Sequence, residues 1–271
     1  EPFLGRALKK YPRNSFYLAT KLPVWLVNSV EDAERLFKEQ LSRLQTKYID
    51  YYLLHALDAG RWEKLVKEGI IEWAEAKKAS GKIRHLGFSF HDTYPVFREI
   101  LTYRQWDFCQ IQYNYIDTQV QAGDKGYELA AKMGVPMVIM EPVKGGRLAN
   151  LPEEAKEALN EADPDRSAAS WALRWVGSHE NVKVILSGMS SMEQLEDNLE
   201  TFGKFQPLTE AEEEAVEKAA DLISSRVKNG CTSCRYCMPC PFGVNIPEMF
   251  SIWNNCAMFD EEEKAKKAYA E

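Results

Sequence analysis

Regular alternation of apolar strand patterns with amphipathic helix patterns is the feature that most constrains the fold of this chain. Short runs of β-branched and aromatic residues predict the strands, and a segment with helical periodicity follows each run. The predicted strands cover residues 16–22, 48–55, 83–90, 108–113, 135–142 and 182–188. Because these runs are largely apolar instead of alternating with polar residues, both faces of the sheet are expected to be covered, which is typical of a parallel α/β sheet.

Helical patterns surround the strands and continue beyond the last one. Ser29 and Thr209 are each followed three residues later by an acidic residue, which predicts helix N-caps at both positions. Helices are predicted over residues 1–10, 62–79, 95–101, 127–133, 153–162, 167–176, 192–202 and 247–253, with a charged tail from residue 260. The helical pattern breaks at residues 228–230, so we expect one domain over residues 1–228 and a second, small one over 229–271.

Six strands are compatible with two architectures. An eight-stranded (β/α)8 TIM-type barrel needs two more strands. Since the chain begins inside a helical pattern, we expect the missing strands to lie before residue 1. The alternative is an open doubly wound sheet, which usually carries a G-x-G-x-x-G turn after its first strand. The sequence lacks such a turn, and we therefore expect the barrel, incomplete at its amino end.

Two polar side chains lie near the carboxyl ends of the first two predicted strands. Lys21 is the penultimate residue of the first strand, and His55 ends the second. The carboxyl ends of parallel strands form the edge where the active sites of α/β proteins lie. We therefore expect Lys21 and His55 to face each other over a pocket and to form the catalytic centre.

Four of the six cysteines lie in one short segment. Their spacing is two residues throughout, and a proline follows the last of them. Soft thiolates at such spacing are typical of iron-sulfur or zinc sites, and the final Cys-Pro is typical of bacterial ferredoxin motifs. The predicted metal ligands are Cys231, Cys234, Cys237 and Cys240. We expect a 4Fe-4S cluster, with zinc as the alternative.

Composition excludes several classes of protein. The chain has 271 residues, of which 45% are hydrophobic and 28% charged, with a net charge of −7. An acidic chain without clustered Lys and Arg is not expected to bind nucleic acid. No apolar run approaches the roughly 20 residues that span a bilayer, so we expect no membrane partner. Because the cysteines suit ligation in a reducing compartment, a cytoplasmic location is expected.

Together with Lys21 and His55, several phrases resemble the aldo/keto reductases over residues 1–205. These phrases are EPFLGRAL (1–8), LATK (18–21), DYYLLH (50–55), LGFS (86–89), QIQYN (110–114), EPVKGG (141–146) and QLEDN (194–198). The cysteine segment resembles the subgroup that carries a ferredoxin-like domain at the carboxyl end. The resemblance implies a barrel enzyme that moves a hydride between NADPH and a small-molecule carbonyl substrate.

The resemblance also implies the roles of individual residues. Lys21 and His55 match two members of the family's catalytic set, whose aspartate and tyrosine are expected before Glu1, so a chain that began at Glu1 is expected to be inactive. NADP(H) is the expected cofactor, with NAD as the alternative, because Gln194 stands where some members place an arginine. The implied cofactor contacts are Ser89, Gln110 and Met140 for the nicotinamide, Val143, Lys144 and Gly145 for the pyrophosphate, and Gly188, Met189, Ser190, Gln194 and Asn198 for the adenosine end.

The cysteine segment departs from the ferredoxin pattern. Its last spacing is two residues instead of three, and the fourth cysteine of such a motif normally serves a second cluster. A second motif is absent before Glu271, so the intact protein is expected to be longer and to carry two 4Fe-4S clusters. We expect the module to exchange electrons with a redox protein partner or to dock it. The alternatives to the enzyme are a nicotinamide-binding sensor and an electron-transfer protein that uses the barrel as scaffold.

Overall fold

The computed structural model describes residues 1–270, which divide into two compact units. Unit 1 consists of Glu1–Tyr113, Asp117–Met140 and Glu180–Leu186. Unit 2 consists of Asn114–Ile116, Glu141–His179 and the chain from Ser187 onward. The boundary that the sequence predicts at residue 228 stays a prediction. The backbone N–H groups of Lys228 and Asn229 there donate to the side-chain oxygen of Asn254, at 3.0 and 2.9 Å.

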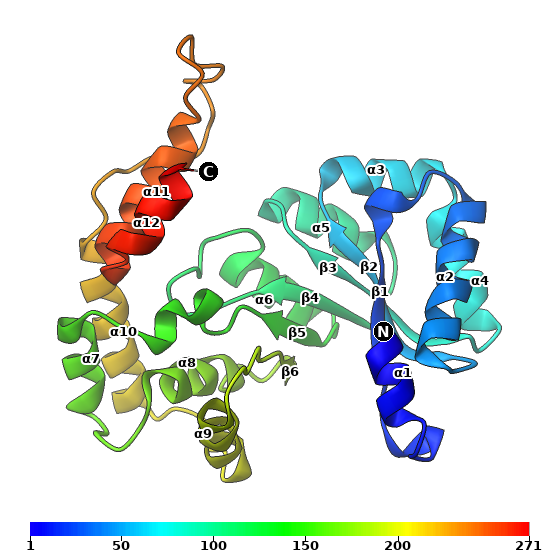
Figure 1. The fold of residues 1–271 in the computed structure, drawn as a ribbon, viewed down its shortest axis with the longest axis horizontal. Coiled ribbons are helices and arrows are strands. Elements are labelled where there is room, and N and C mark those ends of the chain that lie inside the picture. Colours follow the sequence, from blue (N-terminus) through cyan, green and yellow to red (C-terminus); the bar gives the residue numbers. More distant parts are fainter. Residues whose placement is uncertain (271) are drawn as a thin grey trace. The chain divides into compact units, whose positions relative to one another are not determined.

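Unit 1 is built on a parallel sheet of six strands that lie side by side in chain order (Figure 1). The strands are β1 (Ala19–Leu22), β2 (Ile49–Leu57), β3 (Ile83–Phe90), β4 (Phe108–Gln112), β5 (Met137–Met140) and β6 (Val182–Ile185). A doubly wound sheet would reverse its strand order at a switch point. The sequential order of β1 to β6 therefore favours the barrel over the open sheet.

The helices of unit 1 follow the strands, as the alternating pattern predicts. They are α1 (Pro2–Leu8), α2 (Val30–Leu44), α3 (Ala59–Lys67), α4 (Ile70–Ala79), α5 (Tyr94–Tyr103) and α6 (Gly123–Lys132), with 3-10 turns η1 (Arg13–Ser15) and η2 (Val24–Leu26). The single helix expected over 62–79 is wrong, because Gly69 adopts φ 70° and separates α3 from α4. The N-cap expected at Ser29 is confirmed, since its hydroxyl accepts from the Asp32 N–H.

The core of unit 1 joins the sheet to its helices through large aromatic side chains. Phe88 of β3 packs between Phe97 of α5 and Trp106, with ring centroids 5.9 and 4.9 Å away. All three side chains are almost completely buried. Burying an aromatic side chain contributes about 1.5–3 kcal/mol, so this cluster fixes the layer of helices against the sheet that carries the candidate site.

Unit 2 is helical. Its elements are η3 (Lys144–Ala149), α7 (Glu153–Asn160), α8 (Ala168–Gly177), α9 (Met192–Gly203), α10 (Glu210–Ser225), α11 (Ile246–Phe259) and α12 (Glu262–Ala270). The N-cap expected at Thr209 is confirmed, and together with Glu212 it forms a capping box. The helix expected over 247–253 extends further as α11. None of the helices in the described part of the chain combines the length and apolar character needed to span a bilayer.

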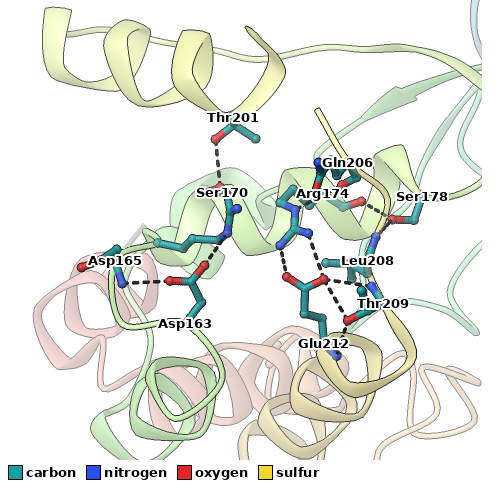
Figure 2. A network of polar contacts seen from close by, with 11 residues as sticks. Asp163, Asp165, Ser170, Arg174, Ser178, Thr201, Gln206, Leu208, Thr209 and Glu212 are labelled. Atoms are coloured by element: carbon teal, nitrogen blue, oxygen red, sulfur yellow. Dashed lines mark hydrogen bonds and ion pairs between the residues drawn. The ribbon is translucent and has the colours of Figure 1, made fainter. Parts of the chain in front are cut away.

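A buried ion pair links α8 to α10 in unit 2 (Figure 2). The guanidinium of Arg174 donates two hydrogen bonds to the carboxylate of Glu212, at 2.6 and 3.0 Å. The Arg174 guanidinium lowers the pKa of Glu212 to about 2, although burial of the carboxylate raises it, and the backbone N–H of Thr209 assists in lowering it. The pair fixes the start of α10 on a core that includes Trp171 and Val216.

Candidate active site

The register of the sheet places five predicted site residues of unit 1 on one face. Paired residues of neighbouring strands point to the same face, as do residues two apart along a strand. The pairs that connect the five are Lys21–Leu53, Leu53–Gly87, Ser89–Gln110 and Gln112–Met140. His55 lies two residues after Leu53, Ser89 two after Gly87, and Gln110 two before Gln112. Lys21, His55, Ser89, Gln110 and Met140 therefore share a face over the carboxyl half of the sheet.

Lys21 is held at the end of β1 by a polar connection to α2. The side-chain amide of the buried Gln40 donates to the backbone carbonyl of Lys21 at 2.7 Å, and its oxygen accepts from the hydroxyl of Tyr52 at 2.7 Å. The Lys21 side chain is half-buried, and desolvation lowers the pKa of its ammonium group. A partly desolvated ammonium exerts a stronger field on a neighbouring oxygen than a solvated one does.

His55 lies beside the ring of Trp25 from the turn η2. The two ring centroids are 5.0 Å apart and the planes are tilted by 52°. Burial lowers the pKa of the imidazole, and the positive charges of Lys21, His91 and Arg61 lower it further. The neutral form is therefore favoured at neutral pH, and a neutral imidazole offers one N–H donor to a substrate oxygen.

The three residues expected near the nicotinamide lie together on β3, β4 and β5. Ser89 and Gln110 are register partners, and both are at least 95% buried. The Ser89 hydroxyl oxygen accepts from the backbone N–H of Ala56 at 2.7 Å. The side-chain amide of Gln110 donates to the thioether of Met140 at 3.2 Å, a weak acceptor. This arrangement leaves a buried amide donor that a stronger acceptor could engage.

The loop expected near the pyrophosphate belongs to unit 2 and turns sharply. Glu141, Lys144, Gly145 and Gly146 all have positive φ, with values of 55, 48, 63 and 91°. A Cβ atom at either glycine would meet no atom within 4 Å. Glycine at these two positions thus suits the positive φ of the backbone and does not relieve crowding. A loop around a phosphate agrees with this geometry, but so does a simple tight turn. The roles of Val143, Lys144 and Gly145 therefore stay predictions.

The segment expected at the adenosine end also belongs to unit 2. The N-cap of α9 is Ser191, whose hydroxyl accepts from the Gln194 N–H. The Gln194 side chain instead accepts from the Ser190 N–H at 2.7 Å, and Asn198 donates to Ser187 at 3.0 Å. Gly188 and Met189 are exposed beside them. Their contact with a nucleotide stays a prediction.

The cysteine segment lies in unit 2 as irregular chain. Cys234 and Cys237 are exposed, whereas Cys231 and Cys240 are half-buried, and all four are free thiols. Within residues 1–270, no three side chains among His, Cys, Asp and Glu lie close enough together to hold a metal ion. The donor chemistry fits a soft metal or a cluster, but the described conformation does not assemble the ligand set.

Two neighbours of His55 are missed by sequence reasoning. Trp25 contacts the imidazole directly, and Arg61 at the start of α3 places its guanidinium 6.0 Å from the centroid of the Trp25 ring. The available signal for Trp25 was a large aromatic residue in the turn directly after the strand of Lys21. Arg61 gave no comparable signal, because it acts through a backbone carbonyl.

Comparison with known proteins shows the family. The sequence profile of the Aldo/keto reductase family matches residues 1–221, and the chain therefore belongs to this family. The structure is similar to that of an aldo-keto reductase from Bacillus halodurans in its holo form. The match covers 80% of this chain and 76% of the other, with a TM-score of 0.67 and 30% sequence identity. The family fold agrees with the parallel α/β sheet of unit 1.

Two curated relatives are more distant in sequence. The chain is 26% identical over 243 residues to the NADH-specific methylglyoxal reductase of Escherichia coli strain K12, covering 73% of each chain. It is 28% identical over 163 residues to an uncharacterized oxidoreductase of Schizosaccharomyces pombe, covering 60% of this chain and 50% of the relative. The matched part thus spans only half the length of this relative.

Proposed function

We propose that this chain belongs to an NAD(P)H-dependent reductase of small carbonyl compounds, in which Lys21 and His55 act on the carbonyl oxygen. The observation that supports the proposal is the sheet register, which places Lys21, His55, Ser89, Gln110 and Met140 on one face. Family membership supplies the reaction class, and the E. coli relative supplies a candidate substrate through its name. The preference between NADP(H) and NAD(H) is part of the test.

The side chains of unit 1 fit distinct roles in such a reaction. The nicotinamide cofactor supplies the hydride when it is bound. The Lys21 ammonium stabilises the negative charge that develops on the carbonyl oxygen, and the neutral His55 donates an N–H to the same oxygen and orients it. Ser89 and Gln110 fit the hydrogen-bonding groups of a carboxamide, and the Gln110 amide now donates to a thioether, a weaker acceptor than a carboxamide oxygen.

A binding titration combined with an activity assay tests this function. We expect NADPH or NADH to quench tryptophan fluorescence in a saturable way, and methylglyoxal or another small aldehyde to oxidise the bound cofactor in the full-length protein. Failure of both cofactors to bind at millimolar concentration would refute the proposal. Binding with no oxidation by any of a panel of aldehydes and ketones would favour the nicotinamide-binding sensor instead.

The four-cysteine segment supports a second, separate proposal, which is that it binds a 4Fe-4S cluster when iron and sulfide are supplied. The support is the donor set of four thiols within ten residues, together with left-handed turns at Ser233 and Arg235 between them. The reduction of a carbonyl by a nicotinamide requires no such cluster. We propose that this segment instead exchanges electrons with a redox protein or provides the surface on which that protein docks.

Metal content under anaerobic purification tests the second proposal. We expect iron and acid-labile sulfide in the wild-type protein and their loss in Cys234→Ser. The matched control is Cys256→Ser, a half-buried cysteine of α11 outside the segment, which is expected to retain the iron. If zinc is found without sulfide, the segment holds a structural zinc ion and not a cluster. If neither iron nor zinc is bound after reconstitution, the proposal that the four cysteines bind a metal is wrong.

A further inference from the structure

The residue after His55 has an unusual backbone conformation. Ala56 lies in the left-handed region with φ 55°, at the point where the register between β2 and β3 shifts between Leu54 and Leu57. For an alanine this conformation is strained, because its Cβ atom lies too close to the following carbonyl oxygen. The backbone at Ala56 therefore depends on its surroundings, and the direction of the His55 side chain depends on that backbone.

Two side chains hold the two hydrogen-bonding groups of Ala56. Its N–H donates to the Ser89 hydroxyl oxygen at 2.7 Å, and its carbonyl accepts from the Arg61 guanidinium at 2.6 Å. Arg61 is itself fixed by Asp58, which accepts from the Arg61 backbone N–H at 2.8 Å and pairs with the guanidinium at 3.3 Å. Because its donor is charged, the hydrogen bond from Arg61 is stronger than one between neutral groups, and it helps to hold the strained residue in place.

The same guanidinium also approaches the aromatic neighbour of His55. It lies 6.0 Å from the centroid of the Trp25 ring, at the limit of a cation–π contact. The Trp25 ring in turn lies 5.0 Å from the imidazole. Arg61 thus contacts both the backbone that carries His55 and the ring on which His55 rests.

We propose that Arg61 is a positioning residue for His55, because it fixes the strained residue Ala56 and the Trp25 ring so that the imidazole points over the active face of the sheet. The catalytic meaning of this positioning rests on the function proposed above. The positioning itself is a property of unit 1 and can be measured without cofactor or substrate.

The charges around His55 make the effect visible in a titration. After burial, the groups that lower the pKa of His55 are Lys21, His91 and Arg61. Removing the Arg61 charge is therefore expected to raise the pKa of His55. Lysine at position 61 keeps the charge but lacks the planar fork that reaches a carbonyl and an aromatic ring together, so it separates the electrostatic effect from the positioning.

NMR titration of the imidazole resonances tests the proposal directly. The chain has four histidines, and His55→Gln assigns the resonance of His55. In Arg61→Met we expect the pKa of His55 to rise and its resonance to shift and broaden as the imidazole samples several orientations. In Arg61→Lys we expect the broadening with little change in pKa. The control is Lys67→Met, which removes a positive charge from an exposed position of the same helix and is expected to leave His55 unchanged.

Activity provides the second readout. In the active enzyme, Arg61→Met is expected to lower kcat by about 10- to 100-fold with unaltered affinity for the cofactor. If the pKa and the NMR resonance of His55 in Arg61→Met were the same as in the wild type, the positioning role would be wrong. If that resonance changes in a protein that binds no nicotinamide cofactor, the proposed function fails while the positioning role holds, so the two failures are distinguishable.

Discussion

Replacement of Lys21 by methionine is expected to lower kcat/KM for carbonyl reduction by about 10²–10³-fold. The reason is the position of the ammonium group, half-buried on the face that it shares with His55. A positive charge held there stabilises negative charge on the carbonyl oxygen more in the transition state than in the bound substrate. The loss should therefore appear in kcat, measured by steady-state oxidation of the nicotinamide cofactor, while the dissociation constant of the cofactor stays unaltered.

The pH profile distinguishes a charge effect at Lys21 from a packing effect. Burial lowers the pKa of Lys21, so its charge, and with it the activity, is expected to be lost on the alkaline side at a lower pH than for a solvated lysine. Lys21→Arg keeps its charge throughout and should lack this alkaline decline. The matched control is Lys47→Met, an exposed lysine near the amino end of β2. If Lys21→Met turned over as fast as Lys47→Met, the catalytic role would be wrong.

The strands could be predicted because a bounded apolar run has few structural solutions. The run at 83–90 coincides with β3. The strand predicted over 16–22 begins only at Ala19 in the structure, because side chains form hydrogen bonds with backbone groups of the preceding residues. Arg13 donates to the Phe16 carbonyl at 3.1 Å, and the Asp50 carboxylate accepts from the Leu18 N–H at 3.0 Å. Such tertiary contacts leave no local pattern in the sequence.

The candidate site could be predicted only in part, for a similar reason. Lys21 and His55 were recognisable from their positions at strand ends, but the shared face of five residues follows from the sheet register, which the sequence alone does not specify. Arg61 contributes through the left-handed conformation of Ala56. Because that conformation is typical of glycine and asparagine and not of alanine, nothing in the sequence pointed to it.

The two partners of the ion pair in unit 2 are expected to differ in how much their replacement lowers the free energy of unfolding. Glu212→Gln is expected to lower the free energy of unfolding by about 3 kcal/mol, because it leaves the Arg174 charge buried without its partner. The Arg174 side chain is 4% exposed and that of Glu212 is 19% exposed. Arg174→Met removes the deeper charge and leaves a carboxylate that water and Thr209 can still solvate. We therefore expect Arg174→Met to cost only about 1–2 kcal/mol. Urea unfolding followed by circular dichroism measures both changes.

The pH dependence of the stability lost in Glu212→Gln shows whether the loss is electrostatic. The pKa of Glu212 is about 2 in the folded chain and about 4.3 in an unfolded one, so the contribution of the carboxylate is complete above the unfolded value. It is lost as the pH falls from about 4.3 towards 2. The difference in the free energy of unfolding between the wild type and Glu212→Gln should narrow over that range. The control is Glu214→Gln, at an exposed position of α10, whose free energy of unfolding should differ from that of the wild type by less than about 0.5 kcal/mol throughout. A gap that stayed constant with pH would assign the effect of Glu212 to packing instead of charge.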